Sequence, residues 1–271
     1  MSQAFSRRLC FGLGLTFAAL GNYASATPAP IVFGVLNQQS PARTAERWNP
    51  LLQYVSAKTG LDLQLRMGAT VRETNAMMGR GEFDFVFTNH NFRPEFDGTY
   101  KVIARLAGKP IFGVIAVLAD SSIQRLTDLV GKRVAFPSRE AFVAYAVPMA
   151  ELKRAKVQVL EVLASTQDSA LAQLKAGAVD AAAVNSRFLT QFSARHGMAY
   201  REIYTSEGFA EIPVIAHPRV SMMQVTAIRQ ALLEMRQDSR GEALLEAAGF
   251  VGFEPASERQ YDNVRRIYRG N

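Results

Sequence analysis

Apolar runs and segments with helical periodicity alternate along most of the chain. Residues 31–36 form a continuous apolar run, which is typical of a strand buried on both faces. Residues 48–55 repeat apolar side chains at helical spacing, and residues 61–67 alternate apolar side chains with others, as a half-buried strand does. This order continues to residue 216. It predicts an α/β fold in which each sheet is mainly parallel and flanked by helices.

The pattern places each expected element within a short range. Strands are expected at residues 31–36, 61–67, 83–87, 100–106, 111–118, 132–136, 157–163, 180–184, 200–204 and 212–216. Later helices are expected at residues 70–78, 123–130, 142–154 and 168–175, after Asn185-Ser186 as far as His196, and at residues 225–235, 241–248 and 257–268. Pro50 lies inside the first helical stretch, so that helix is expected to kink or to begin near it. Gly60 then provides a C-terminal cap.

The number of elements suits two α/β lobes, although no linker rich in glycine, serine or proline divides the chain. Two extended crossings between compact lobes satisfy both observations. We expect them at residues 108–114 and 210–216. Lobe 1 would then combine residues 27–108 with the C-terminal helices of residues 215–271, and lobe 2 would span residues 109–214.

The first 26 residues have the pattern of a secretory signal. Arg7 and Arg8 precede an apolar run at residues 9–20, and Ala24-Ser25-Ala26 matches a small-x-small cleavage site. The run is shorter than the roughly 20 apolar residues that a membrane-spanning helix needs. We expect cleavage after Ala26 and a periplasmic mature protein. The departure from a twin-arginine signal at Leu9-Cys10 favours the general secretion route.

Composition excludes several classes of chemistry. Cys10, inside the predicted signal, is the only cysteine, so the mature chain would have no disulfide, thiolate metal site or cysteine nucleophile. Removing residues 1–26 takes away two arginines and lowers the formal net charge from +7 to +5. The chain has no block of consecutive lysine and arginine residues, and we expect no nucleic-acid partner.

Catalytic and cofactor motifs are missing from the sequence. His90, His196 and His217 lie far apart without metal-ligand spacing, and we expect no metal site. There is no Gly-x-Ser-x-Gly, P-loop or Gly-x-Gly-x-x-Gly sequence. The pairs Met77-Met78 and Met222-Met223 are expected to pack in the core rather than to line a cofactor site. The sequence therefore favours a binding protein that is not an enzyme and needs no cofactor.

Polar residues follow several of the expected strands. Open α/β sheets bind ligands beyond the carboxyl ends of their strands. The helix starts at residues 138–142 and 166–168 offer free N–H groups and a partial positive charge, which suits an oxyanion. The side chains we expect to face a ligand are Asn37, Thr88, Asn89, Ser138, Arg139 and Asn185. Phe142 or Tyr145 would pack on the apolar part of that ligand.

Six stretches of the mature chain, in the same order, resemble the phosphate/phosphite/phosphonate-type periplasmic solute-binding proteins of ABC importers. They are Phe33-Gly34-Val35 and residues 47–55, 81–85, 126–136, 145–148 and 177–185. The resemblance implies a type 2 periplasmic-binding-protein fold, with the ligand held in a cleft between two closing lobes. It also implies delivery of that ligand to an inner-membrane ABC permease. We expect the receptor to be a monomer.

The chain departs from this family at the positions that hold a phosphonate. Family members typically carry a Ser-Thr-Ser-Gly-like sequence just before the Tyr-x-x-Pro stretch, where this chain has residues 141–144, Ala-Phe-Val-Ala. The histidine-acid pair of the next helix start reads Gln167-Asp168, and Asn185 replaces an acidic residue. The resemblance supports capture by closure of the lobes and leaves the identity of the ligand open.

The leading hypothesis is a receptor that captures a small oxyanion, such as a phosphonate, phosphate or phosphite, or a related polar solute. An alternative with the same fold is a periplasmic sensor that signals to a membrane kinase or a chemoreceptor. An α/β enzyme is disfavoured because no catalytic constellation is present. The effector domain of a transcription regulator is disfavoured by the predicted signal and the missing helix-turn-helix.

Overall fold

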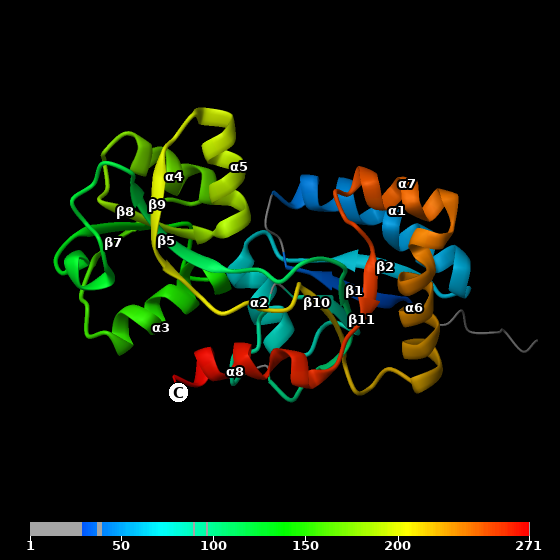
Figure 1. The fold of residues 1–271 in the computed structure, drawn as a ribbon. Coiled ribbons are helices and arrows are strands. Elements are labelled where there is room, and N and C mark those ends of the chain that lie inside the picture. Colours follow the sequence, from blue (N-terminus) through cyan, green and yellow to red (C-terminus); the bar gives the residue numbers. More distant parts are fainter. Residues whose placement is uncertain (1–28, 37–39, 89, 96, 271) are drawn as a thin grey trace, which may run out of the picture.

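The computed structural model describes residues 29–36, 40–88, 90–95 and 97–270. The predicted signal with Cys10, and the candidate site residues Asn37 and Asn89, lie outside these ranges. Two sheets, connected by two extended crossings, form the body of the protein (Figure 1). This architecture confirms the predicted two-lobed α/β fold.

The first sheet has six strands in the order β11-β4-β10-β3-β1-β2. These strands are β1 (Ile31–Val35), β2 (Leu63–Arg66), β3 (Phe85–Phe87), β4 (Lys101–Leu106), β10 (Pro213–Ala216) and β11 (Phe253–Pro255). We call this sheet and the helices packed on it lobe 1. The strands come from both ends of the chain, so lobe 1 is discontinuous in sequence.

The second sheet has five strands in the order β7-β6-β8-β5-β9. These strands are β5 (Gly113–Leu118), β6 (Arg133–Phe136), β7 (Leu160–Leu163), β8 (Ala181–Asn185) and β9 (Tyr200–Thr205). We call this sheet and its helices lobe 2. They form one continuous stretch of chain. The division of the whole chain at residues 108/109 and 214/215 stays a prediction.

The strand directions differ from the mainly parallel sheets that the sequence predicted. β1 is parallel to β2 and β3, and β6 is parallel to β7 and β8. However, β10 runs antiparallel to β3 and β4, and β5 runs antiparallel to β8 and β9. Strand–helix–strand steps keep strands parallel. β5 and β10 instead follow the crossings, and enter their sheets from the opposite end.

Twelve helical segments surround the sheets in the described residues. They are α1 (Pro41–Thr59), α2 (Val71–Gly79), η1 (Leu126–Leu129), η2 (Phe142–Ala146), α3 (Val147–Arg154), α4 (Gln167–Lys175), α5 (Ser186–His196), α6 (Met222–Glu234), η3 (Met235–Gln237), α7 (Ser239–Ala247), η4 (Glu258–Tyr261) and α8 (Asp262–Arg269). None of the helices in the described ranges is long and apolar enough to span a membrane.

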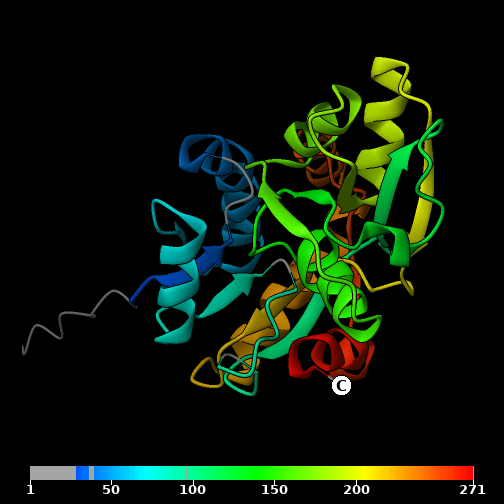
Figure 2. The same ribbon diagram turned by 90° about the vertical axis from the view of Figure 1, so that its left-hand side faces the viewer.

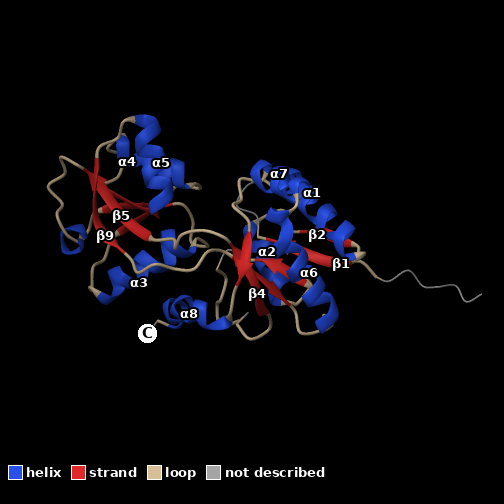
Figure 3. Ribbon diagram, turned by 45° about the vertical axis from the view of Figure 1, so that its right-hand side comes forward, coloured by secondary structure: helices blue, strands red, loops and turns tan. Residues whose placement is uncertain are grey.

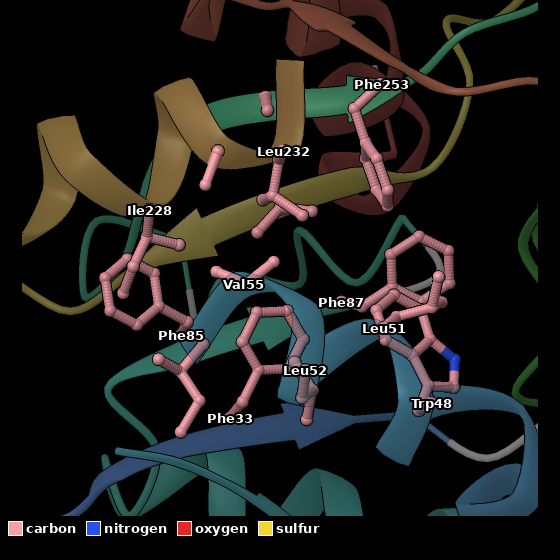
Figure 4. Close-up of a cluster of buried hydrophobic side chains, with 14 of the residues drawn as sticks. Phe33, Trp48, Leu51, Leu52, Val55, Phe85, Phe87, Ile228, Leu232 and Phe253 are labelled. Carbon is pink, nitrogen blue, oxygen red and sulfur yellow. The ribbon is translucent and has the colours of Figure 1, made fainter. Parts of the chain in front are cut away.

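The main core of lobe 1 lies between its sheet and helices α1, α6 and α7 (Figure 4). Trp48 from α1 packs with its ring centroid 4.7 Å from that of Phe87 and 5.6 Å from that of Phe33. Ile228 and Leu232 of α6 cover the same face of the sheet. Helix α2 covers the other face, where Met77 and Met78 are buried as predicted.

One of the two predicted forms of helix α1, a start near Pro50, is wrong. It begins at Pro41, after the N-cap Ser40, and continues through Pro50 to Thr59. Pro50 therefore lies in the middle of the helix instead of near its start. The predicted C-terminal cap is confirmed, because Gly60 adopts a left-handed conformation with φ of 71°.

Three further local predictions need correction. Residues 123–130 contain only the short 3-10 turn η1, and the strand expected at residues 157–163 begins at Leu160. Met222 and Met223 are 76% and 79% exposed at the start of α6, so this pair does not pack in the core. The first turn of α6 lies beyond the face that Ile228 and Leu232 bury, which leaves both methionines in solvent.

The two crossings are residues 107–112, between β4 and β5, and residues 206–212, between β9 and β10. They run side by side and are joined by backbone hydrogen bonds. The N–H of Ile111 donates to the carbonyl of Phe209 and the N–H of Phe209 donates to the carbonyl of Ile111, each at 2.9 Å. Helix α8 lies beneath these segments, between the lobes, in Figure 3. It is at the lower edge of the molecule in both Figure 1 and Figure 2. The crossings and α8 together form the junction of the lobes.

Candidate functional site

The loop after β6 reaches from lobe 2 to lobe 1 and makes a direct polar contact. The Oε2 atom of Glu140 accepts a hydrogen bond from Asn75 Nδ2 at 3.0 Å and another from Arg93 Nη2 at 2.7 Å. Asn75 lies in the middle of α2, and Arg93 lies in the segment after β3. Both donors belong to lobe 1, so this one oxygen connects the two lobes.

Buried amides support the lobe 1 side of this contact. Asn75 and Asn91 are 7% and 5% exposed, and Asn91 Nδ2 donates to Asn75 Oδ1 at 2.7 Å. This bond leaves Asn75 Nδ2 directed at Glu140. The Oδ1 atom of Asn91 is buried and has no hydrogen-bond partner among the described residues. A buried acceptor in that condition is rare in folded proteins.

Phe142, two residues after Glu140, fills the junction of the lobes. Its side chain is 2% exposed. The ring lies 4.9 Å from Phe209 in a crossing and 5.4 Å from Tyr268 in α8, centroid to centroid. It also stacks on His90 at 5.3 Å. Phe142 therefore packs against the protein itself.

The helix start that carries Phe142 is a single π-helical turn, η2, followed directly by α3. Such turns occur often at functional sites. The turn presses against the start of β5, because a Cβ atom added to Gly113 would lie 2.1 Å from the carbonyl oxygen of Val143. Only glycine allows this approach between two backbones.

His90 is a buried histidine at the same junction, 1% exposed and with φ of 60°. Its Nε2 atom lies 2.5 Å from the carbonyl oxygen of Ala210 in a crossing. Burial lowers the pKa of His90 from 6.5 to about 4, partly opposed by this carbonyl. The neutral ring must therefore carry its proton on Nε2 to donate this bond.

A second ionic contact joins lobe 2 to a crossing. Arg187 Nη2 donates to Glu211 Oε1 at 2.5 Å, and Glu211 is 4% exposed. The carbonyl of Glu211 accepts a hydrogen bond from the hydroxyl of Tyr261 at 2.6 Å. Burial raises the pKa of Tyr261, so this hydroxyl remains a donor. These bonds fix the crossing between the C-terminal segment and α5.

Two residues predicted to contact the ligand, Arg139 and Tyr145, bond within lobe 2 in this structure. Arg139 Nη2 lies 3.3 Å from Glu161 Oε2, and the hydroxyl of Tyr145 donates to the same oxygen at 3.0 Å. Burial and the neighbouring Glu161 carboxylate raise the pKa of Tyr145. Neither side chain has a described bond to lobe 1.

The remaining predicted side chains are spread over both lobes. Thr88 is fully buried in lobe 1, and its hydroxyl lies 3.6 Å from the sulfur of Met78. Asn185 caps α5 by accepting from the N–H of Arg187 at 2.9 Å. Ser138 is half-buried in the loop before η2. Ser138 and Arg139 lie in the loop before η2, and Phe142 is the first residue of η2. Asn185 pairs with Gly113, whose backbone touches η2 at Val143, and Thr88 lies two residues before His90, which stacks on Phe142.

Asn75, Asn91, Arg93 and Glu140 are not among the residues that the sequence pattern predicts for the site. One usable signal is present for Asn75, because it lies two residues before the apolar pair Met77-Met78 in a predicted helix. A polar residue near a buried face needs a hydrogen-bond partner. Glu140 and Arg93 carried no such signal. The described residues contain no group of three His, Cys, Asp or Glu side chains placed to hold a metal ion.

Comparisons with known proteins agree with this architecture. The sequence model of the periplasmic substrate-binding proteins of phosphonate ABC transporters matches residues 33–261. A Xanthomonas citri protein with bound ATP is similar, with a TM-score of 0.74, 17% identity, and coverage of 89% of this chain and 96% of that chain. No protein with a curated function matches the sequence.

Two further solved structures are similar to this chain. One is a Prochlorococcus marinus protein in complex with methylphosphonate, with a TM-score of 0.70, 16% identity, and coverage of 90% of this chain and 98% of that chain. The other is a binding-protein component of an ABC phosphonate transporter from Pseudomonas aeruginosa. Its TM-score is 0.68 at 15% identity, with coverage of 88% of this chain and 85% of that chain. These likenesses identify the fold as that of type 2 periplasmic binding proteins, and the matched sequence model shows that the chain belongs to the family of periplasmic substrate-binding proteins of phosphonate ABC transporters.

Proposed function

We propose that this protein is the exported receptor of an ABC importer, and that it captures a small oxyanion or a related polar solute between its two lobes. Membership of a transport family supports capture over catalysis. The observation that carries the proposal is the junction itself. There, donors of lobe 1, Asn75 and Arg93, meet a helix start of lobe 2 across a pair of crossings that can act as a hinge.

In lobe closure, the crossings would act as the hinge, and groups on both lobes would bind the solute. The crossings are joined to each other at Ile111 and Phe209, so they would bend as one unit. Helix α4 begins after its N-cap Thr166 and directs its positive dipole end outward, although Asp168 lies in its first turn. Arg93 adds a cationic group from lobe 1, which is paired with Glu140 in this structure. Bringing these groups together around a solute excludes water, which strengthens each hydrogen bond to it.

The loss of the family's phosphonate cradle supports a different ligand for this chain. Residues 141–144 carry no hydroxyl group, and Phe142 packs against His90 and Phe209. The Prochlorococcus marinus relative was solved with methylphosphonate. We infer that the solute of this receptor shares the negative charge of a phosphonate but is held by other groups.

A ligand screen tests this function. Purified mature protein would be mixed with phosphate, phosphite, methylphosphonate, a sulfonate and malonate, with arginine and glucose as cationic and neutral controls. We expect at least one anion to raise the midpoint of thermal unfolding and to reduce the radius of gyration in X-ray scattering. A response only to arginine or glucose would contradict the oxyanion proposal, and a shape unchanged by any bound solute would contradict closure.

We further propose a periplasmic, monomeric mature protein that begins at Thr27 and delivers its solute to an inner-membrane permease. N-terminal sequencing of the protein from a periplasmic extract should give Thr27 as the first residue. Recovery of the chain in the cytoplasm with residues 1–26 intact would contradict export. Light scattering should give the mass of one chain, and a stable dimer would contradict the monomer.

A further inference from the structure

The Glu140 carboxylate is bound as an anionic solute would be. It comes from lobe 2, while both of its donors, Asn75 and Arg93, come from lobe 1. The side chains of Arg93 and Glu140 are 27% and 30% exposed, and Asn75 is 7% exposed. The donors are therefore buried or half-buried, at the junction where the lobes meet.

We propose that Asn75 and Arg93 form an anion-binding subsite of lobe 1 for a carboxylate or oxyanion group of the solute, and that Glu140 is a tethered competitor for it. This inference rests on the proposed function. A solute anion that enters the subsite takes the place of the Glu140 carboxylate. The side chain at position 140 thereby sets the affinity that a solute anion needs in order to occupy the subsite.

The two donors are held in place before any solute arrives. Asn91 Nδ2 fixes the amide of Asn75 through a bond of 2.7 Å to its Oδ1 atom. The guanidinium of Arg93 lies 5.9 Å from the centroid of the Tyr268 ring. Donors that are already oriented lose little conformational freedom on binding, which favours affinity.

A second observation at the same place points to a solute. The buried Oδ1 atom of Asn91 lacks a donor among the described residues. It belongs to the amide that positions Asn75. A solute with an N–H or O–H group beside its anionic group would supply that donor. A monoprotonated oxyanion and a hydroxycarboxylate both have this chemistry.

Charge explains why Glu140 competes. Arg93 and Glu140 neutralise each other, so a second anion gains little attraction to the subsite. Replacing Glu140 leaves the Arg93 charge and the Asn75 amide without their present partner. Hydrogen bonds to charged groups are among the stronger ones in proteins. The subsite should therefore bind free anions better once the tethered carboxylate is removed.

The test compares Glu140→Ala and Glu140→Gln with the wild-type protein. Glu151→Gln is the matched control, because Glu151 pairs with Arg154 on the same helix of lobe 2. Bound solute is first removed by unfolding, dialysis and refolding. Affinities for inorganic phosphate, methylphosphonate and glycolate are then measured by calorimetry. We expect Glu140→Ala to bind at least one of them about tenfold more tightly than wild type, and Glu151→Gln to match wild type.

The double variant Glu140→Ala/Arg93→Met should lose this gain, since it removes the charge that the anion contacts. Glu140→Gln keeps a hydrogen-bond acceptor but no charge, so it separates the effect of charge from that of side-chain size. It also replaces Glu140→Ala in the test if the alanine variant does not fold. Unchanged anion affinity in both Glu140 variants would overturn the inference, as would a gain that persists without Arg93.

The outcome also distinguishes this inference from the proposed function. One outcome is that wild-type protein binds an anion and closes on it while the Glu140 variants have the same anion affinity as wild type. That result supports the proposed receptor function and contradicts the role of Glu140 as a competitor. If no anion binds to wild type or to any Glu140 variant while a neutral or cationic solute does, both fail. Binding that is seen only after Glu140 is replaced supports the competitor directly.

Discussion

Replacing Phe142 by alanine tests whether the lobes meet in solution as they do in this structure. The ring is 2% exposed and lies within 4.9–5.4 Å of the rings of Phe209, His90 and Tyr268. Truncation of a buried phenylalanine removes about 3–5 kcal/mol from the free energy of unfolding. For a protein of this size, such a loss lowers the midpoint of thermal unfolding by roughly 10 °C.

The assay is unfolding by heat and by urea, followed by circular dichroism. Phe188→Ala is the matched control, because Phe188 is 38% exposed on α5. Substitution of an exposed side chain usually changes stability by less than about 0.5 kcal/mol. If Phe142→Ala were no more destabilised than Phe188→Ala, Phe142 would be exposed in solution. The packing described at the junction would then be refuted.

Two other predictions concern the same junction. His90→Gln should remove a pH dependence: wild-type stability should fall as pH decreases from 6.5 to about 4, because the unfolded state binds a proton there that the folded state does not. Urea unfolding across this window should give a flatter profile for the variant, and equal slopes would contradict the buried neutral ring. Gly113→Ala should lower the unfolding midpoint, since its Cβ would lie 2.1 Å from the Val143 carbonyl oxygen. Overpacking of this kind costs about 1–3 kcal/mol, and a variant as stable as wild type would show that these backbones are further apart.

The sequence predicted the elements of the fold better than the directions of its strands. Apolar runs such as residues 31–36 locate strands because burial on both faces requires them. Direction depends on how the chain enters a sheet. β10 and β5 are antiparallel to their neighbours because each follows a crossing, and no local pattern encodes that step. Pro50 also does not mark the start of its helix, because packing of Trp48, Leu51 and Val55 sustains α1 across it.

The candidate site was less predictable than the fold. The sequence placed ligand contacts at strand ends, and it selected Arg139 and Tyr145 for their chemistry and position. Both bond to Glu161 on the neighbouring strand, a partner that only tertiary structure brings close. Asn75 and Glu140 are 65 residues apart and meet only because the lobes meet. Contacts between lobes leave no periodic signal in either partner.

The discontinuity of lobe 1 has a consequence for the order of folding. Strands β5 to β9 of lobe 2 lie in one stretch, from Gly113 to Thr205, so lobe 2 can assemble from neighbouring segments as soon as they are available. The lobe 1 sheet pairs β4 with β11, which lies near the end of the chain. Closing so long a loop is slow compared with local pairing. A chain that crosses a membrane from its N-terminus would therefore complete lobe 2 first, and the arrival of β11 and α8 would finish lobe 1 and the junction in a single late step.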